Sequence, residues 1–139
     1  MLLGIGVASA AAALPLPRAD RGAKVTHISC NVTGVWRGNG VDVAHTRWTF
    51  VLALTQRDVA VQGAFDWHGS NGDTGRENVA GRVDCSRRQL ELHGVSLEHA
   101  PTLGLARYQL ALDAAFGAFS GRWTGGVPGT LQATRDPRR

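Results

Sequence analysis

The sequence predicts an all-β domain, a single antiparallel up-and-down barrel of about eight strands. Short apolar runs alternate residue by residue, as strands do when one face is buried. Most connections between these runs have hairpin length, and the 18 glycines among 139 residues are typical of a chain with many turns. Closure into a barrel would leave no exposed strand edge. The alternative is a β-sandwich, whose Greek-key crossings normally need longer connections.

The first three strands are expected before the middle of the chain. Residues 31–38 form the first. Residues 46–56 form the second, because large apolar side chains share one face and small or polar ones share the other. A tight turn at Arg57 and Asp58 leads into residues 59–69, where apolar side chains again share a face. This period of two residues indicates strands and not helices.

The remaining strands follow a polar loop. Residues 77–85 and 88–94 form the next two strands, and the long connection 95–104 comes after them. The last three strands are expected at 105–114, 116–125 and 128–136. The side chains expected to point inward are Trp48, Phe50, Leu52, Leu54, Val61, Phe65, Trp67, Leu90, Leu92, Tyr108, Leu110, Leu112, Phe119 and Trp123.

The N-terminal segment predicts an exported protein. Residues 1–14 are apolar with a run of small residues suited to signal-peptidase cleavage, so we predict a signal peptide. The run is too short to span a bilayer as a stable helix; the other interpretation is an N-terminal tail. Residues 15–29 are expected to be a linker, 30–136 the barrel and 137–139 a tail. The predicted location is secreted or periplasmic, and the single lysine among many arginines suggests a bacterial source.

The two cysteines, Cys30 and Cys85, are an even number in a chain predicted to be exported. One disulfide is therefore expected, closing a long loop between the first strand and a middle strand. The other interpretation is two separate buried thiols. No Cys-x-x-Cys spacing occurs, and we predict no metal site.

The charge pattern does not indicate a nucleic-acid partner. The formal net charge is +4, but the arginines are scattered along the whole chain. A nucleic-acid-binding protein usually concentrates its positive charge on one face. The stretch Arg37-Gly38-Asn39-Gly40 lacks the Lys-Ser/Thr pair of a phosphate-binding loop. We therefore predict no nucleic-acid binding and no cofactor.

The first strand and the end of the last carry a resemblance to a known superfamily. Gly34-Val35-Trp36 resembles the Gly-x-Trp that opens lipocalin and avidin barrels, the calycins, and Arg135 is similar in position to their basic residue after the last strand. The resemblance implies structural roles for Gly34, Trp36 and Arg135, with the indole closing one barrel end beneath the guanidinium. The lipocalin Thr-Asp-Tyr motif and the pocket tryptophans of the later avidin strands are absent, so biotin binding is not expected.

The stretch FDWHGSNGDTGREN, residues 65–78, contains several side chains that could take part in catalysis or metal binding. Asp73-Thr74-Gly75 is the tripeptide of aspartic proteases, but nothing here supplies the buried pair of carboxylates that such enzymes need. The oxygens of Asp66, Asn71, Asp73 and Glu77 could ligate Ca²⁺, but their spacing does not match an EF-hand loop. We interpret the centre of this stretch as a solvated hairpin connection at the barrel rim.

Three functions remain open from the sequence. The first is an exported binding module, which holds a small apolar ligand at the barrel mouth or presents its outer face to a protein partner. The second is an enzyme with Asp66 and His68, or His93, as acid and base, although alternation points both histidines outward; whether the chain is an enzyme stays uncertain. The third is a packed structural domain without a ligand.

A cavity of a few hundred Å³ distinguishes the pocket functions from the third. The residues expected to line it are Trp48, Trp67, Tyr108, Phe119 and Trp123.

Overall fold

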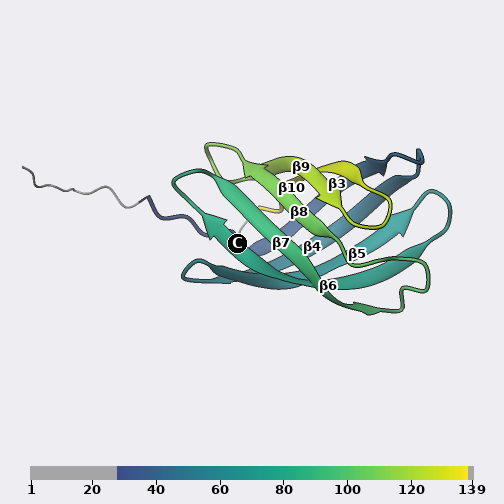
Figure 1. Ribbon diagram of the computed structural model, residues 1–139. Helices are drawn as coiled ribbons and strands as arrows, with labels where there is room; N and C mark the ends of the chain where they lie inside the picture. Colours follow the sequence, from purple (N-terminus) through teal and green to yellow (C-terminus); the bar gives the residue numbers. More distant parts are fainter. Residues whose placement is uncertain (1–27, 138–139) are drawn as a thin grey trace, which may run out of the picture.

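The computed structural model describes residues 28–137, whose strands close into one antiparallel barrel (Figure 1). Each strand pairs with its neighbours in sequence, and the last strand returns to pair with the first. The up-and-down barrel is therefore confirmed and the sandwich alternative is wrong. The strands are β3 (Gly34–Asp42), β4 (Arg47–Arg57), β5 (Ala60–Gly69), β6 (Thr74–Asp84), β7 (Gln89–Glu98), β8 (Arg107–Leu112), β9 (Ala118–Thr124) and β10 (Gly129–Arg135).

The predicted signal peptide and nearly all of the predicted linker lie outside the described residues, so both stay predictions. Within residues 28–137, no helix is long and apolar enough to cross a membrane.

Three strands are longer than the sequence predicted. β3 continues to Asp42, β6 already begins at Thr74, and β7 continues to Glu98. The extensions of β3 and β6 consist mainly of glycine and polar residues, which carry no apolar alternation. In the extension of β7 the pairing with β6 shifts register, and Val95 is exposed. Backbone pairing nevertheless continues through them, as between Val41 and Arg47 or between Arg76 and Glu98. The ladder hydrogen bonds, which the side chains do not reveal, thus lengthen the barrel.

The interior follows the expected alternation. Every side chain predicted to point inward is buried. Val59, which alternation placed on the same face, is instead exposed because it lies in the turn between β4 and β5. Most of the core is therefore set by a period of two residues along each strand.

Glycines inside three strands allow the sheet to coil into a narrow barrel. A Cβ atom at Gly63, Gly81 or Gly121 would lie 1.8–2.0 Å from a carbonyl oxygen of the neighbouring strand. No side chain fits at that distance, so these positions require glycine for close approach of two backbones.

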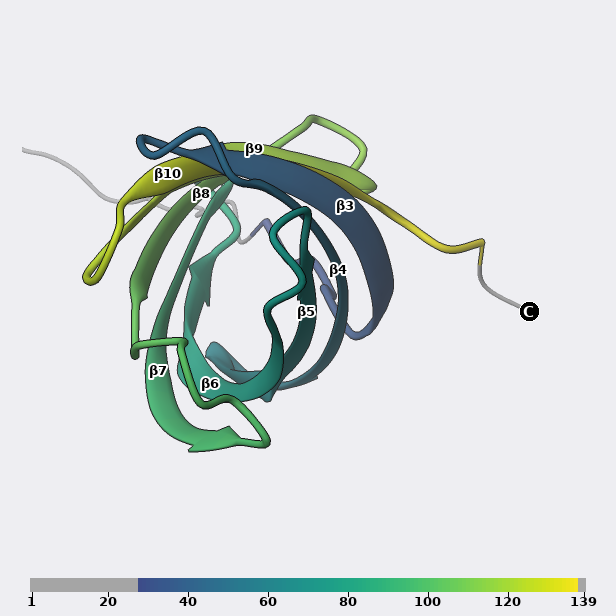
Figure 2. The same ribbon diagram turned by 90° about the vertical axis from the view of Figure 1, so that its right-hand side faces the viewer.

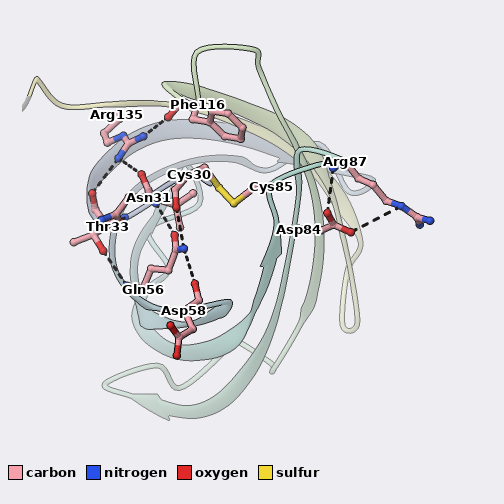
Figure 3. Close-up of a disulfide and its surroundings, with 11 residues drawn as sticks. Cys30, Asn31, Thr33, Gln56, Asp58, Asp84, Cys85, Arg87, Phe116 and Arg135 are labelled. Atoms are coloured by element: carbon pink, nitrogen blue, oxygen red, sulfur yellow. Dashed lines mark hydrogen bonds and ion pairs between the residues drawn. A yellow bond between two sulfur atoms is a disulfide. The ribbon is translucent and has the colours of Figure 1, made fainter. Parts of the chain in front are cut away.

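A disulfide fastens the segment before β3 across one end of the barrel (Figure 3). Cys30 is bonded to Cys85, which follows β6, with a Cα–Cα distance of 5.6 Å. This confirms the predicted pairing. Disulfides are typical of proteins in oxidising compartments, and the bond agrees in this respect with the predicted export.

Trp36 closes the same end from inside. Its indole is fully buried and packs on Phe119, with ring centroids 5.1 Å apart. The indole N–H donates to the carbonyl oxygen of Val32 at 3.0 Å. The guanidinium carbon of Arg135 lies 4.9 Å from the centroid of the Trp36 ring. A Cβ on Gly34 would approach the Arg135 side chain to 3.1 Å, so all three residues of the calycin resemblance meet here.

Two polar side chains hold the crossing segment in place (Figure 3). Arg135 donates to the carbonyl oxygens of Asn31 and Thr33 at 2.7 and 3.1 Å, and also to that of Phe116. Gln56 accepts from the Val32 N–H at 2.8 Å and donates to the Cys30 carbonyl oxygen at 3.0 Å. The Gln56 carboxamide therefore forms the backbone hydrogen bonds with this segment that a neighbouring strand would otherwise form.

Candidate ligand-binding site at the open end of the barrel

The opposite end of the barrel contains a cavity of about 320 Å³. Four connections surround this end, those between β3 and β4, β5 and β6, β7 and β8, and β9 and β10 (Figure 2). The half of the barrel nearer the disulfide is filled by Trp36, Phe50, Phe65 and Phe119, whose rings lie in contact with one another. The barrel is thus packed at one end and hollow at the other.

Aromatic side chains from four strands form the cavity walls. Trp48, Trp67, Tyr108 and Trp123 all line it. Trp67 is central, because its ring centroid lies 5.9 Å from that of Trp48 and 5.7 Å from that of Trp123. Phe119, the fifth residue predicted for the pocket, does not line the cavity and packs on Trp36 near the closed end. Ligand contact by the other four stays a prediction.

Two of the wall rings are fixed by hydrogen bonds to their indole nitrogens. The Trp48 N–H donates to Asp42 Oδ2 at 3.1 Å, and the Trp123 N–H donates to the Val127 carbonyl oxygen at 2.8 Å. Asp42 Oδ1 also accepts from the backbone N–H groups of Ala44 and Thr46, at 2.9 and 3.0 Å. The turn after β3 and the Trp48 ring are therefore held by one carboxylate.

A buried carboxyl group, Glu77 of β6, lines the same cavity. The residue is only 2% exposed. Oε2 accepts from the Ala106 N–H at 2.8 Å, and Oε1 accepts from the Tyr108 hydroxyl. A Cβ on Gly94 would lie 2.2 Å from Oε2, so glycine at this position makes room for the carboxyl group. Glu77 and Tyr108 together form a polar pair among aromatic rings.

Burial raises the pKa values of both Glu77 and Tyr108. Loss of solvation raises the pKa of Glu77 above 4.5, although its hydrogen bonds with Tyr108, Ala106 and Trp67 act in the opposite direction. The pKa of Tyr108 is also raised, first by burial and then by the neighbouring Glu77 carboxylate. Both groups are therefore held towards their neutral forms.

We expect the stability of the fold to fall as the pH rises through the pKa of folded Glu77. Its raised pKa means that the folded state binds the proton more tightly, so this contribution is fully present below pH 4.5 and is lost as Glu77 ionises. Urea unfolding of the wild type and Glu77→Gln at a series of pH values would measure the difference. Exposed Glu91→Gln, on the outer face of β7, is the control. A wild-type stability that rose with pH relative to Glu77→Gln would contradict the assignment.

Sequence reasoning missed Glu77 and Asp42 as cavity residues. It considered Glu77 only as a possible Ca²⁺ ligand and as the start of a strand, and it considered Asp42 only among the polar residues after the first strand, in the comparison with avidins. The missed signal was alternation, because Glu77 shares its face of β6 with the buried Val79 and Val83. Asp42 likewise shares its face of β3 with Trp36.

The residues proposed as acid and base do not reach the cavity. His68 and His93 are exposed on the outer surface. Asp66 forms an exposed ion pair with Arg76, its Oδ1 lying 3.0 Å from the Arg76 Nε. The structure therefore does not bring Asp66, His68 and His93 together at the mouth, and the enzyme hypothesis loses the residues on which it rested.

The other chemistry considered for residues 65–78 is also not assembled. Asp66 faces outward and Glu77 inward, while the Asp73 carboxylate accepts from the Asn71 side chain at 3.1 Å within the hairpin connection. Asp73 lies just before β6, which begins at Thr74, and its side chain bonds to Asn71 and not to a second carboxylate. Among residues 28–137, no group of three or more His, Cys, Asp or Glu side chains is placed to hold a metal ion.

Fold and cavity together define a small β-barrel that is closed at one end and has a ligand-sized, aromatic-walled cavity at the other. No protein-family model matches the sequence. No curated protein matches it either.

Several solved structures of designed β-barrels share the fold. One, described as a redesigned β-barrel, mFAP1, bound to DFHBI, is 15% identical with a TM-score of 0.62, covering 76% of this chain and 94% of its own. Another, mFAP0 bound to DFHBI, is 14% identical with a TM-score of 0.61, covering 75% and 98%. A fluorescence-activating β-barrel of de novo design is 12% identical, with a TM-score of 0.56 and coverage of 75% and 93%. At these identities the likeness shows the fold alone, and the resemblance to avidins stays a prediction.

Proposed function

We propose that this protein binds a small, largely apolar and flat molecule in the open end of its barrel. The observation that carries the proposal is the cavity of about 320 Å³, walled by three indoles and a phenol and lined by two buried carboxyl groups, Asp42 and Glu77. Small-molecule sites are typically concave and mostly apolar, with a few polar groups that orient the ligand.

The fixed walls support a preformed site. Asp42 and the Val127 carbonyl oxygen hold two of the indoles, and the packed closed half supports the rings from below. A site that is already ordered loses little conformational entropy when the ligand enters, which favours affinity.

The solved barrels support the proposal at the level of architecture. Two of those with a similar fold are described as bound to DFHBI, so a barrel of similar fold can accommodate a small molecule. We further propose that the protein acts after export, in a secreted or periplasmic location, where the Cys30–Cys85 disulfide would persist.

Filling the cavity should abolish binding. The neutral dye N-phenyl-1-naphthylamine is the probe, and we expect saturable fluorescence enhancement with one dye molecule per chain. Ala106→Phe places a ring in the cavity and should weaken dye affinity at least about tenfold. Ala111→Phe is the matched control, because Ala111 lies on the exposed face of the same region of the sheet, in β8.

Near-UV circular dichroism and thermal unfolding would establish that both variants are folded. Equal dye affinity in folded Ala106→Phe and Ala111→Phe would show that the cavity is not the binding site. No dye binding to the wild type would favour the packed structural domain or a surface for a protein partner.

A further inference from the structure

The cavity has a sign of charge opposite to that of the whole chain. Its charged lining residues are Asp42, Asp73 and Glu77, and no arginine, lysine or histidine is among the residues that line it within the described chain. The formal net charge of the protein is nevertheless +4. The arginines of the neighbouring strands are on the outer surface, such as Arg76 in β6 and Arg107 in β8. Strand alternation therefore keeps these arginines out of the cavity, although acidic residues such as Glu91 also lie on the outer surface.

The three acidic side chains differ in burial and in the number of hydrogen bonds that they already accept, and so in their ability to bind a ligand. Asp42 already accepts three hydrogen bonds and holds the turn and Trp48. Asp73 lies in the connection at the rim, partly exposed. Glu77 is the more deeply buried of the two buried carboxyl groups, 2% exposed against 7% for Asp42, and its hydrogen-bond partners are Ala106, Tyr108 and Trp67. A carboxylate has about four lone-pair sites, so Glu77 can accept a further donor from a molecule in the cavity.

The walls favour the same kind of ligand as the carboxylates. The faces of indole and phenol rings attract organic cations, and tryptophan does so most strongly. The electrostatic field of acidic groups inside low-dielectric walls is concentrated within a cavity. An anionic ligand would be repelled by the acidic residues of the lining, with no cationic side chain there to compensate.

We propose that the ligand is an organic amine in its cationic form, with its ammonium group against Glu77 and its apolar part between Trp67 and Trp123. This inference rests on the proposed function, because it assigns a chemical class to the ligand of that cavity. Without a ligand, burial favours the neutral form of Glu77, and an ammonium group beside it favours the ionised carboxylate. The amine therefore supplies the counter-charge that ionised Glu77 lacks among the lining residues. Tyr108, the titratable neighbour in contact with Glu77, orients the carboxylate.

Three probes of one size test the charge preference in the wild-type protein. Phenethylamine, 2-phenylethanol and phenylacetate share a phenylethyl or benzyl body and differ in carrying a positive, neutral or negative polar end. Isothermal titration calorimetry should give phenethylamine the highest affinity, about tenfold above 2-phenylethanol, and phenylacetate the lowest.

Glu77→Gln keeps the size of the side chain and removes the charge. It should lower phenethylamine affinity about tenfold, to that of 2-phenylethanol, and leave 2-phenylethanol affinity unchanged. Glu91→Gln on the outer face of β7 should change neither. If Glu77→Gln does not fold, Asp73→Asn at the rim should reduce the preference for the amine by a smaller factor.

The outcomes separate this inference from the proposed function. Equal affinities for the amine and the alcohol, or tighter binding of phenylacetate, would overturn the amine assignment and leave a ligand-binding barrel. Binding of N-phenyl-1-naphthylamine with no binding of phenethylamine would do the same. Failure of all four probes would overturn both proposals.

Discussion

Trp36→Ala is expected to lower the free energy of unfolding by about 3–5 kcal/mol, the usual cost of removing a large aromatic side chain from a core. The indole is fully buried, and its loss would leave a void beside Phe119 and remove the ring beneath the Arg135 guanidinium. The Val32 carbonyl oxygen would also lose its hydrogen-bond donor. For a domain of this size such a loss is a large share of the total stability.

Urea unfolding followed by far-UV circular dichroism would measure this change. Val35→Ala is the matched control, because Val35 precedes Trp36 in β3, points outward and is 36% exposed. We expect its effect to be below about 1 kcal/mol. Trp36→Phe should fall between the two, since it keeps a ring but not the N–H. Equal losses for Trp36→Ala and Val35→Ala would contradict the role of Trp36 as the closing residue.

Removing the disulfide is expected to cost a similar amount. The cysteines are 55 residues apart in sequence, and the chain-entropy model gives about 4 kcal/mol for a closed loop of that length. The double variant Cys30→Ser with Cys85→Ser should therefore unfold at a much lower urea concentration than the oxidised wild type. Reduced wild type should resemble the double variant, and a reductant should not affect the double variant. Identical midpoints for oxidised and reduced wild type would contradict the prediction.

The two changes should not be additive. The disulfide fixes Cys30, and Val32, two residues further on, accepts the Trp36 hydrogen bond. Without the disulfide, the segment that Trp36 contacts is less constrained. Trp36→Ala should then lower the free energy of unfolding by a smaller amount. A double-mutant cycle would show this coupling as a combined loss smaller than the sum of the separate losses.

The architecture could be predicted because buried and exposed positions alternate along most of each strand. The added parts of β3 and β6 could not, because they are polar or glycine-rich and leave no apolar pattern in the sequence. The added part of β7 could not, because the register of its pairing with β6 shifts there. Strand lengths at the mouth were therefore underestimated where the site lies.

The cavity residues were predicted from residue type. This explains why Phe119 was included and why Glu77 was left out. Phe119 was assigned to the pocket because it is an inward aromatic residue, but its depth depends on the register of β9 with its neighbours, which places it near Trp36. Glu77 was not assigned to the pocket because it is charged, although alternation along β6 placed it inside. A charged residue in phase with buried neighbours was the signal that could have been used.

The distribution of the four tryptophans gives the protein built-in optical reporters. Three of them line the cavity, and the fourth, Trp36, is at the far end of the barrel. In Trp36→Phe, all remaining indole emission would come from rings that line the cavity. A non-fluorescent molecule could then be titrated by the intrinsic emission of the protein, with no label attached near the mouth.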